Sequence, residues 1–464
     1  MSIFASFEIG RKALRVQHKG MEVSGQNVAN ANTPGYSRQR TEMEAVTPPI
    51  VAGISMAPGR GVVVTDIIRV RSEFYHAQLV STSSHKCYWE MRRETYQGAE
   101  AIFMEPDDHG INKYLGGFFD IWQELSSSPE DIAVRSGLRE QAISLTRSVE
   151  DTYLRLETMR LDYTNEIYMR VDEVNRLAEE ISEINEKIRF IDALQQKSNE
   201  LLDQLDVRIE DLSKLVDVRV HYKQSGSVEI FVGGRVLVQE DRSFNIAVDV
   251  DETGYLHIVS HRGLPMNLQN GRVLGLAEAI NHNIPDLQEE LNLIVSTLVE
   301  DVNVLHLAGF GLGQEDGYTF FDLIAEPAIP AALQFRVSSE IMGDTSFIAA
   351  SSRTGEPGNG EVALEIARLR DQRFPGRLNG LSISEYYRGV VTSMGAEAQE
   401  SIRMEEAFGR TEAQLIELHR SIAGVNLDEE MLNMTQFQHS WHAAARYLNY
   451  VDQMLSMLFT ELGR

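Results

Sequence analysis

Residues 171–216 read VDEVNRLAEEISEINEKIRFIDALQQKSNELLDQLDVRIEDLSKLV. Apolar side chains recur there in alternating steps of three and four, which is typical of a helix that buries one face against another helix. Two polar residues, Gln195 and Ser198, occupy this register near its centre. The positions that carry the pattern are Val174, Leu177, Ile181, Ile184, Ile188, Ile191, Leu202, Leu205, Ile209, Leu212 and Val216. The stretch predicts a coiled-coil or helical-bundle architecture.

The helical pattern extends toward the N-terminus, since residues 138–225 contain neither glycine nor proline. A continuous helix from Ser144 to Val216 would be about 100 Å long at a rise of 1.5 Å per residue. The alternation of three- and four-residue steps between apolar residues is interrupted over residues 163–171, where we expect a bend or a break in the helix. An element of this length favours a fibrous or bundle protein over a compact enzyme.

Apolar residues alternate with period two after residue 217, which predicts strands. Tight turns are marked by Ser225-Gly226, by Gly233-Gly234 and by residues 252–254. We therefore predict a small antiparallel β module over residues 218–263. The helices expected elsewhere cover residues 75–101, 272–281, 285–305, 361–374, 384–423 and 427–462. Residues 308–360 are rich in Gly, Pro and Ser, with a strand-like piece at 333–337 and a loop at 353–360.

The last helix carries an unbroken apolar stripe. Asn426 and Glu429 form a capping-box start. The stripe consists of Met434, Phe437, Trp441, Ala444, Leu448, Val451, Leu455, Leu458 and Leu462. Burying these nine side chains contributes on the order of 15 kcal/mol. An isolated helix is marginal in water, so this stripe requires a partner helix.

The first helix is expected over about residues 2–30 and carries two apolar lines on nearly opposite faces. One line is Phe7, Leu14, Met21 and Val28, and the other is Ile9, Val16 and Val23. A helix that is apolar on two faces is usually buried between neighbours on both sides. This pattern favours an assembly of packed terminal helices.

Residues 27–39 read NVANANTPGYSRQ, and residues 421–434 read SIAGVNLDEEMLNM. Pro34 and Gly35 stop the first helix, and the chain is expected to run extended from Tyr36. The two motifs, at opposite ends of the chain, resemble those of the flagellar axial family of rod, hook and hook-associated proteins. Gln438 and residues 443–446 agree with the same pattern.

The resemblance is closer to the hook-associated members than to hook or rod proteins at residues 36–39 and 424–429. The chain departs from the family pattern at His439, at Trp441 and over residues 447–450. These departures leave the heptad stripe intact. Weaker likenesses occur at 202–220, 233–238 and 302–321, the last including Asn303, His306 and Gly309.

The resemblance implies a fold that is mainly α with β insertions (α+β), in which long terminal helices form a coiled coil or helical bundle. It implies terminal helices (1–35 and 427–464) that are disordered in the monomer and line the inner tube after assembly. A helical bundle domain is expected over 36–217 and 264–426, with irregular and β segments at 311–360. The implied assembly residues are Asn27, Asn30, Thr33, Pro34, Gly35, Tyr36, Met434, Phe437, Trp441, Leu448, Val451, Leu455 and Leu458.

The resemblance also implies an extracellular location at the hook–filament junction of the bacterial flagellum, reached through the flagellar type III export channel. The implied partners are further copies of the chain, the hook protein, hook-associated protein 3 and an export chaperone on the C-terminal helix. The alternatives are a hook or rod axial protein and a cytoplasmic coiled-coil scaffold. A monomer whose termini resist proteolysis would favour the scaffold.

Composition narrows the partners further. The 464 residues include 43 Lys+Arg and 69 Asp+Glu, for a net charge of -26. Such acidity disfavours nucleic acid and anionic membranes as partners. The single cysteine, Cys87, allows no intramolecular disulfide. We expect no cleaved signal peptide and no transmembrane helix, because charge arrives early and no apolar run is long enough.

Three patterns offer alternative sites. His439 and His442 share a helix face, but no acidic residue completes a zinc motif. Residues 309–313 read GFGLG, which follows a helix rather than a strand and is expected to form a turn. Cys87 lies near His85, but no third orienting group is evident. We therefore expect no catalytic, metal or cofactor residues and no enzymatic activity.

Overall fold

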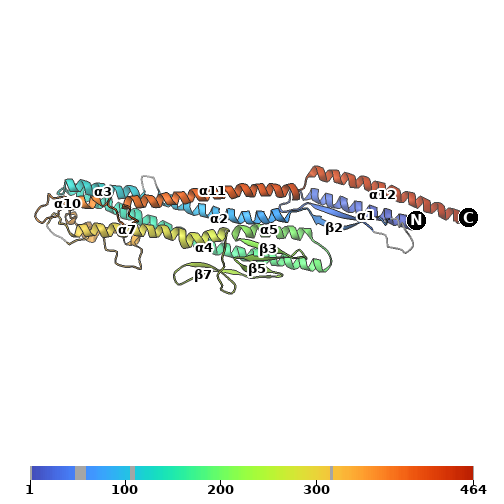
Figure 1. Cartoon of the computed structure of the whole chain (residues 1–464), viewed down its shortest axis with the longest axis horizontal. Coiled ribbons are helices and arrows are strands. Elements are labelled where there is room, and N and C mark those ends of the chain that lie inside the picture. The colour runs from blue at the N-terminus through green and yellow to red at the C-terminus, as the bar shows by residue number, and fades with distance from the viewer. Residues whose placement is uncertain (1–2, 47–58, 105–109, 314–316, 463–464) are drawn as a thin grey trace. The chain divides into compact units, whose positions relative to one another are not determined.

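The computed structural model describes residues 3–46, 59–104, 110–313 and 317–462 (Figure 1). Contacts divide the chain into two compact units. The first unit contains Met1–Ser83, Asn175–Asn245 and Phe408–Arg464. The second contains Ser84–Val174 and Ile246–Ala407. Each unit is therefore assembled from segments that lie far apart in the sequence.

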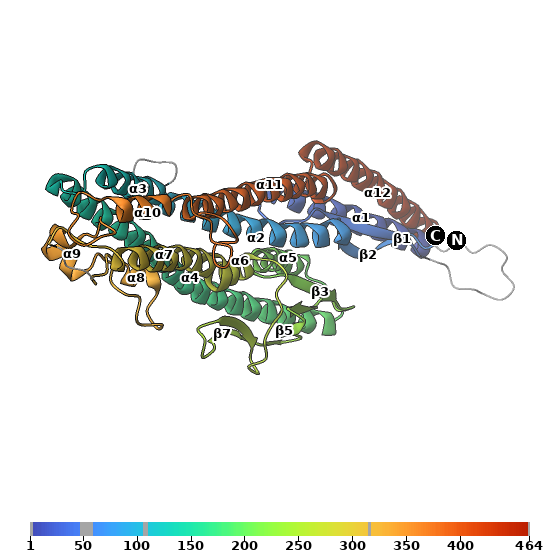
Figure 2. The same ribbon diagram turned by 60° about the vertical axis from the view of Figure 1, so that its left-hand side comes forward.

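The two terminal helices pack side by side in the first unit, as Figures 1 and 2 show. They are α1 (Ile3–Ala29) and α12 (Leu427–Leu462), which confirms both predicted helices. Gly10 of α1 lies against Leu448 and Gly20 lies against Phe437, so the helices run antiparallel. The strands β1 (Gln39–Ala45) and β2 (Val62–Arg69) pair antiparallel and also contact α1.

The continuous helix predicted from Ser144 to Val216 was wrong. The chain forms α4 (Ile132–Ala193) and α5 (Asn199–Leu215) with a turn between them. Gln195 adopts a positive φ of 57°, and the Ser198 side chain caps α5 by accepting a hydrogen bond from the Leu201 N–H. The two polar positions in the heptad register are thus the ones at which the chain turns.

After this turn α5 folds back along α4, and Arg208 pairs with Glu180 at 2.8 Å. The apolar residues on the two sides of the turn, such as Ile184 and Leu205, are buried. The break expected at residues 163–171 was wrong, because α4 is unbroken there.

The strands predicted over residues 218–263 are present, and so are their turns. They form two sheets rather than one: an antiparallel four-stranded sheet in the order β3-β4-β5-β6 and a two-stranded sheet, β7-β8. The four-stranded sheet belongs to the first unit and the β7-β8 pair to the second. The strands are β3 (Val218–Tyr222), β4 (Val228–Val232), β5 (Arg235–Gln239), β6 (Arg242–Ser243), β7 (Ile246–Val250) and β8 (Leu256–Ser260).

Helices make up most of the second unit and enclose one apolar core. The largest fully buried side chains there include Trp122, Tyr387, Phe118 and Phe320. The longer helices that lie wholly or partly in this unit are α2 (Glu73–Phe103), α3 (Ile111–Ser127), α4, α6 (Arg272–Glu278), α7 (Ile284–Leu307), α10 (Glu361–Arg368) and α11 (Ile383–Ala423). A π-helical turn, Ala279–Asn283, joins α6 to α7. The helix α3 had not been predicted, and α10 is shorter than expected.

Buried polar side chains of α7 hold the segment after it. Asn303 accepts hydrogen bonds from the N–H groups of Phe320 and Phe321, and His306 contacts the Tyr318 carbonyl at 2.8 Å. The strand expected at 333–337 was wrong: α8 (Ala331–Gln334) takes its first two residues, and Val337 makes only an isolated antiparallel bridge with Phe321. The other short elements are α9 (Ser339–Gly343) and a 3-10 turn, Thr345–Phe347.

The predicted fold class, mainly α with antiparallel β insertions and long terminal helices, is confirmed. The predicted domain boundaries, and the disorder of the terminal helices in the monomer, remain predictions. Within the described ranges, no helix is both long enough and apolar enough to cross a membrane.

Candidate functional site: the junction of the terminal motifs

The two sequence motifs from opposite ends of the chain meet in the first unit. Arg38 follows the Pro34-Gly35 turn, and its Nη1 lies 2.9 Å from a carboxylate oxygen of Glu429. Its Nε and Nη2 lie 2.8 and 2.7 Å from Glu430 Oε1. The Arg38 N–H also donates to the Ala423 carbonyl at 2.9 Å, at the end of α11. Arg38 therefore ties the strand entering β1 to the start of α12.

Asn27 organises the N-terminal side of this junction. Its Oδ1 accepts hydrogen bonds from the Tyr36 hydroxyl and from the Gln39 N–H, both at 2.9 Å. Its Nδ2 donates to the Gln39 carbonyl at 2.9 Å. The amide of a buried α1 residue thus occupies the edge of β1 at Gln39, in the way that a neighbouring strand would.

Asp203 of α5 holds the same loop in place by accepting two hydrogen bonds. One of its oxygens accepts the Ser37 N–H at 3.0 Å, and the other accepts Arg69 Nη1 at 2.8 Å. Burial, followed by the charges of Asp203, Glu200 and Glu430, raises the pKa of Tyr36 to about 12. Tyr36 is therefore a neutral phenol at physiological pH and donates its proton to Asn27.

The turn of the motif is fixed by local geometry. Asn30 donates to the Gln26 carbonyl at 3.0 Å and accepts the Thr33 hydroxyl at 3.2 Å, which closes the end of α1. Gly35 has a φ of 77°, and an added Cβ would lie 2.4 Å from Val207. Both observations require glycine at this position. Pro34 is exposed and lines a hollow of about 450 Å³ beside Glu200.

The apolar stripe predicted on α12 faces α1 along most of its length. Phe437 and Leu448 rest on the glycines of α1, where an added Cβ would lie 2.7 Å from either side chain. Val451 is fully buried. Met434, Trp441 and Leu455 are half-buried, whereas Leu458 is exposed. These glycines let the two helix backbones approach closely.

The structure brings the N-terminal motif residues Asn27, Asn30, Thr33, Gly35 and Tyr36 together, and it places the α12 seam on α1. Sequence reasoning missed four residues of the junction: Arg38, Gln39, Asp203 and Glu430. Arg38 and Glu430 lie inside the quoted motifs with opposite charges, which is a signal that could have paired them. Asp203 lies in the middle of a helical heptad and carries no such signal.

The alternative sites of the sequence lie outside this junction. His439 and His442 are exposed on α12, and the loop at 309–313 is a turn after α7. Cys87 is half-buried within α2. No group of three or more His, Cys, Asp or Glu in the described part of the chain is arranged to hold a metal ion.

The family models match two parts of the chain. Residues 96–321 match the model described as "Flagellar hook-associated protein FlgK helical domain". Residues 421–460 match "Flagellar basal body rod FlgEFG protein C-terminal". The second match covers the motif that contacts Arg38 together with most of α12.

Relatives agree over the whole length. Flagellar hook-associated protein 1 of Bacillus subtilis (strain 168) is 27% identical, over 100% of this chain and 99% of the relative. The protein of the same name from Escherichia coli (strain K12) is 22% identical, over 96% and 97%. The flagellar hook junction protein FlgK of Burkholderia pseudomallei has the same fold, with a TM-score of 0.65 at 14% identity. That match covers 75% of this chain and 100% of that one.

Motifs that meet in space, two family models in the expected order and relatives aligned end to end agree with one another: along its whole length the chain is similar to flagellar hook-associated protein 1, and its role is that of a structural component of the flagellum.

Proposed function

We propose that this chain is a structural subunit of the hook–filament junction, which joins hook to filament by assembling through its terminal helices. The observation that carries the proposal is a second apolar surface on the α1–α12 pair, which remains exposed after the two helices have packed together. The role at the hook–filament junction is inferred from the names of the relatives, and the mode of assembly is inferred from this exposed surface.

The exposed surface has a helical period. On α12, Tyr447, Tyr450, Met454 and Met457 are exposed and follow one another at steps of three and four. Because α1 runs antiparallel to α12, its exposed Phe4 and Phe7 lie toward the same end of the pair; Leu458 completes this group. We call these seven residues the outer terminal surface. A helix pair that buries one seam internally and exposes another is suited to packing between neighbours.

Other copies of the chain would cover the outer terminal surface in a ring. The hook protein would lie on one side of the ring and hook-associated protein 3 on the other, as the family resemblance implies. Before assembly an export chaperone would shield α12, and the chain would leave the cell through the flagellar export channel. The contacts of Arg38 with Glu429 and Glu430 would fix the direction in which the α1–α12 pair extends from the rest of the first unit. No catalytic activity is part of this proposal.

The experiment is electron microscopy of cells that lack the chain, with an assay for filament subunit in the medium. We expect bare hooks and filament protein lost to the medium, both corrected by the wild-type gene. Missing hooks would instead assign the chain to the rod or hook. Normal filaments would contradict any axial role and would favour the cytoplasmic scaffold.

Substitutions then test the outer terminal surface. The double variant Tyr450→Ser/Met457→Ser leaves the α12 residues that pack on α1 untouched, so the chain should still fold and be exported. It should fail to restore filaments, because the outer terminal surface loses two of its apolar side chains. Gln453→Ser, an exposed polar position on the same helix, is the matched control and should restore them. Full restoration by the double variant would show that this surface is not needed for assembly.

A further inference from the structure

An exposed apolar row follows α4 in the second unit. Leu154, Leu161 and Tyr168 are spaced by seven residues and are 46%, 54% and 45% exposed. They lie on the face of α4 opposite to Leu156 and Ile167, which are fully buried in the core. Seven-residue spacing is the period with which one helix meets another. We call these three residues the α4 row.

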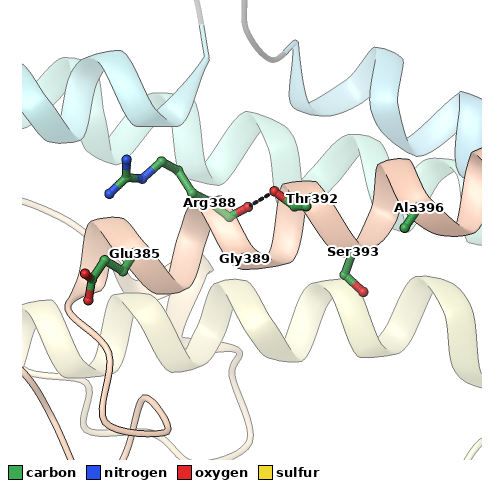
Figure 3. Close-up of a pocket in the computed structure, with 6 residues that line it drawn as sticks. All are labelled: Glu385, Arg388, Gly389, Thr392, Ser393 and Ala396. Atoms are coloured by element: carbon green, nitrogen blue, oxygen red, sulfur yellow. Dashed lines mark hydrogen bonds between the residues drawn. The ribbon is translucent and has the colours of Figure 1, made fainter.

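A hollow of small residues lies on α11 of the same unit (Figure 3). It has a volume of about 540 Å³ and is lined by Gly389, Thr392, Ser393 and Ala396, with Glu385 and Arg388 at one end. The Thr392 hydroxyl donates a hydrogen bond of 2.7 Å to the Arg388 carbonyl of the same helix, so this side chain lies against the helix and does not fill the hollow. An added Cβ at Gly389 would meet no described atom within 4 Å. A glycine inside a helix costs about 1 kcal/mol relative to alanine, and no contact in this unit requires it.

The row and the hollow lie at the same height along the unit. On α7, Gln288 bonds Glu157 of α4 at 3.1 Å, and two residues later Glu290 bonds Tyr386 of α11. Residue 157 of α4 and residue 386 of α11 therefore lie at about the same position along the length of the helices.

A second level lies further along both helices. On α2, Arg92 bonds Glu397 of α11, and nearby Glu94 is joined through Arg272 to Glu166 of α4. The numbering rises in the same direction on α4 and α11, so these helices run parallel. Leu161 therefore lies level with the middle of the hollow.

The two surfaces point to different sides of the unit. The helix α2 contacts α4 through Gly98 and Met159 and contacts α11 through Arg92 and Glu397. The helix α7 likewise bonds both α4 and α11. Since α2 and α7 lie between them, α4 and α11 expose separate faces. One copy can therefore use its row and its hollow at the same time, which is the head-to-tail arrangement from which rings or helical filaments are built.

Charges at the two surfaces are complementary. Arg155 and Asp162 follow Leu154 and Leu161 in the sequence and lie on one side of the α4 row; both are exposed and have no ion-pair partner among the described residues. Glu385 lies level with Arg155, and Arg388 lies within about one helical turn of the level of Asp162. A helix of a second copy docked in parallel would place each cation beside a carboxylate. This balance stands out in a chain whose net charge is -26.

We propose that the α4 row of one copy packs into the α11 hollow of the next copy, as a lateral contact in the assembled ring. The contact rests on the proposed function, since it requires copies that stand side by side in one orientation. It adds a second interface, in the helical unit, to the terminal helices.

Disulfide trapping in purified flagella tests the contact. In a Cys87→Ala background, Leu161→Cys combined with Thr392→Cys should give a ladder of covalent oligomers on oxidation, resolved on a non-reducing gel. Each single variant should remain monomeric. Leu161→Cys combined with Asp371→Cys, an exposed position outside the hollow, is the matched control and should give no ladder.

The outcomes separate the two proposals. If the chain is present in the flagella but the Leu161/Thr392 pair gives no ladder, the lateral contact is wrong and the junction role stands. A dimer from Leu161→Cys alone would mean that the row pairs with itself, which also overturns the contact. If the wild-type chain is absent from purified flagella, the proposed function and the contact fall together. A charge swap adds a readout: Arg155→Glu should reduce the ladder, and Glu385→Arg should restore it.

Discussion

Arg38 and Glu430 are separated by 392 residues in the sequence, yet Arg38 Nε donates a hydrogen bond of 2.8 Å to Glu430 Oε1. Glu430 is only 2% exposed, so its charge is compensated mainly by this arginine. The contact joins the segment that leaves α1 to the first turn of α12. It therefore connects the packing of the terminal helix pair to the rest of the first unit.

Removing the arginine should loosen the start of α12. Arg38→Ala leaves the buried Glu430 carboxylate without its donor, which costs about 1–3 kcal/mol. We expect faster hydrogen exchange over residues 427–434 and a lower urea midpoint. Arg11→Ala, which breaks an exposed pair with Glu8, is the control and should change stability by less than about 0.5 kcal/mol. Equal effects of the two substitutions would contradict a special role for the Arg38 contact.

The glycines of α1 should resist substitution where α12 approaches. In Gly20→Ala the new Cβ would lie 2.7 Å from the Phe437 ring, so the helices must shift, at a cost of about 1–3 kcal/mol. Gly25 on the same helix has no described atom within 4 Å of an added Cβ. Gly25→Ala should therefore stabilise the chain by about 0.5–1 kcal/mol. Thermal unfolding of the two variants should move in opposite directions, and a stabilised Gly20→Ala variant would refute the close approach.

His306 should make the second unit sensitive to acid. It is buried; its Nδ1 faces the Tyr318 carbonyl at 2.8 Å, and its Nε2 accepts the Ala349 N–H at 2.9 Å. Burial lowers the pKa of His306 to about 4, against about 6.5 for an unfolded histidine. The neutral ring has the one donor and the one acceptor that these partners need.

The unfolded chain therefore binds the proton first as pH falls. The contribution of His306 is complete above pH 6.5 and declines between about pH 6.5 and 4, by a total of the order of 3 kcal/mol. His306→Gln should lower stability at pH 7.5 and flatten the decline toward pH 4. The exposed His439→Gln is the control and should leave the slope unchanged. Denaturant titrations at several pH values measure both slopes, and an unchanged slope in His306→Gln would contradict this assignment.

Arg135 should be essential for the segment after α7. Its guanidinium is 1% exposed and donates to the carbonyls of Pro129, Thr345 and Ile348 at 2.7, 3.3 and 2.6 Å. Burial lowers the pKa of Arg135 to about 10, so the group stays charged at neutral pH. Arg135→Met keeps much of the volume but removes every donor, and it should destabilise the chain by about 3 kcal/mol.

Limited proteolysis measures the local effect at residues 344–349. We expect early cleavage there in Arg135→Met and wild-type resistance in Arg147→Met, whose arginine is exposed on the same helix. Cleavage at the same rate in both variants would rule out a specific anchoring role for Arg135.

The sequence by itself determined the elements that carry strong periodic patterns. The bounds of α12 match the prediction, because its heptad stripe, its Asn426 cap and the preceding Gly424 all agree. The turns at Gly226, Gly233, Gly234 and Gly254 were also predictable, since these glycines adopt the positive φ that such turns require. Charge and spacing identified the two terminal motifs, although not the residues through which they meet.

Tertiary structure decided where periodicity was ambiguous. The heptads of α4 and α5 share one register, and only packing shows that the chain folds back at Gln195 and Ser198, where two apolar faces can cover each other. The same holds for the contacts between the terminal motifs: Arg38–Glu430 and Ser37–Asp203 join residues 392 and 166 positions apart in the sequence. Local propensity carries no information about such pairs, because the free energy that selects them comes from burying both partners at once, and that burial exists only when the whole chain has folded.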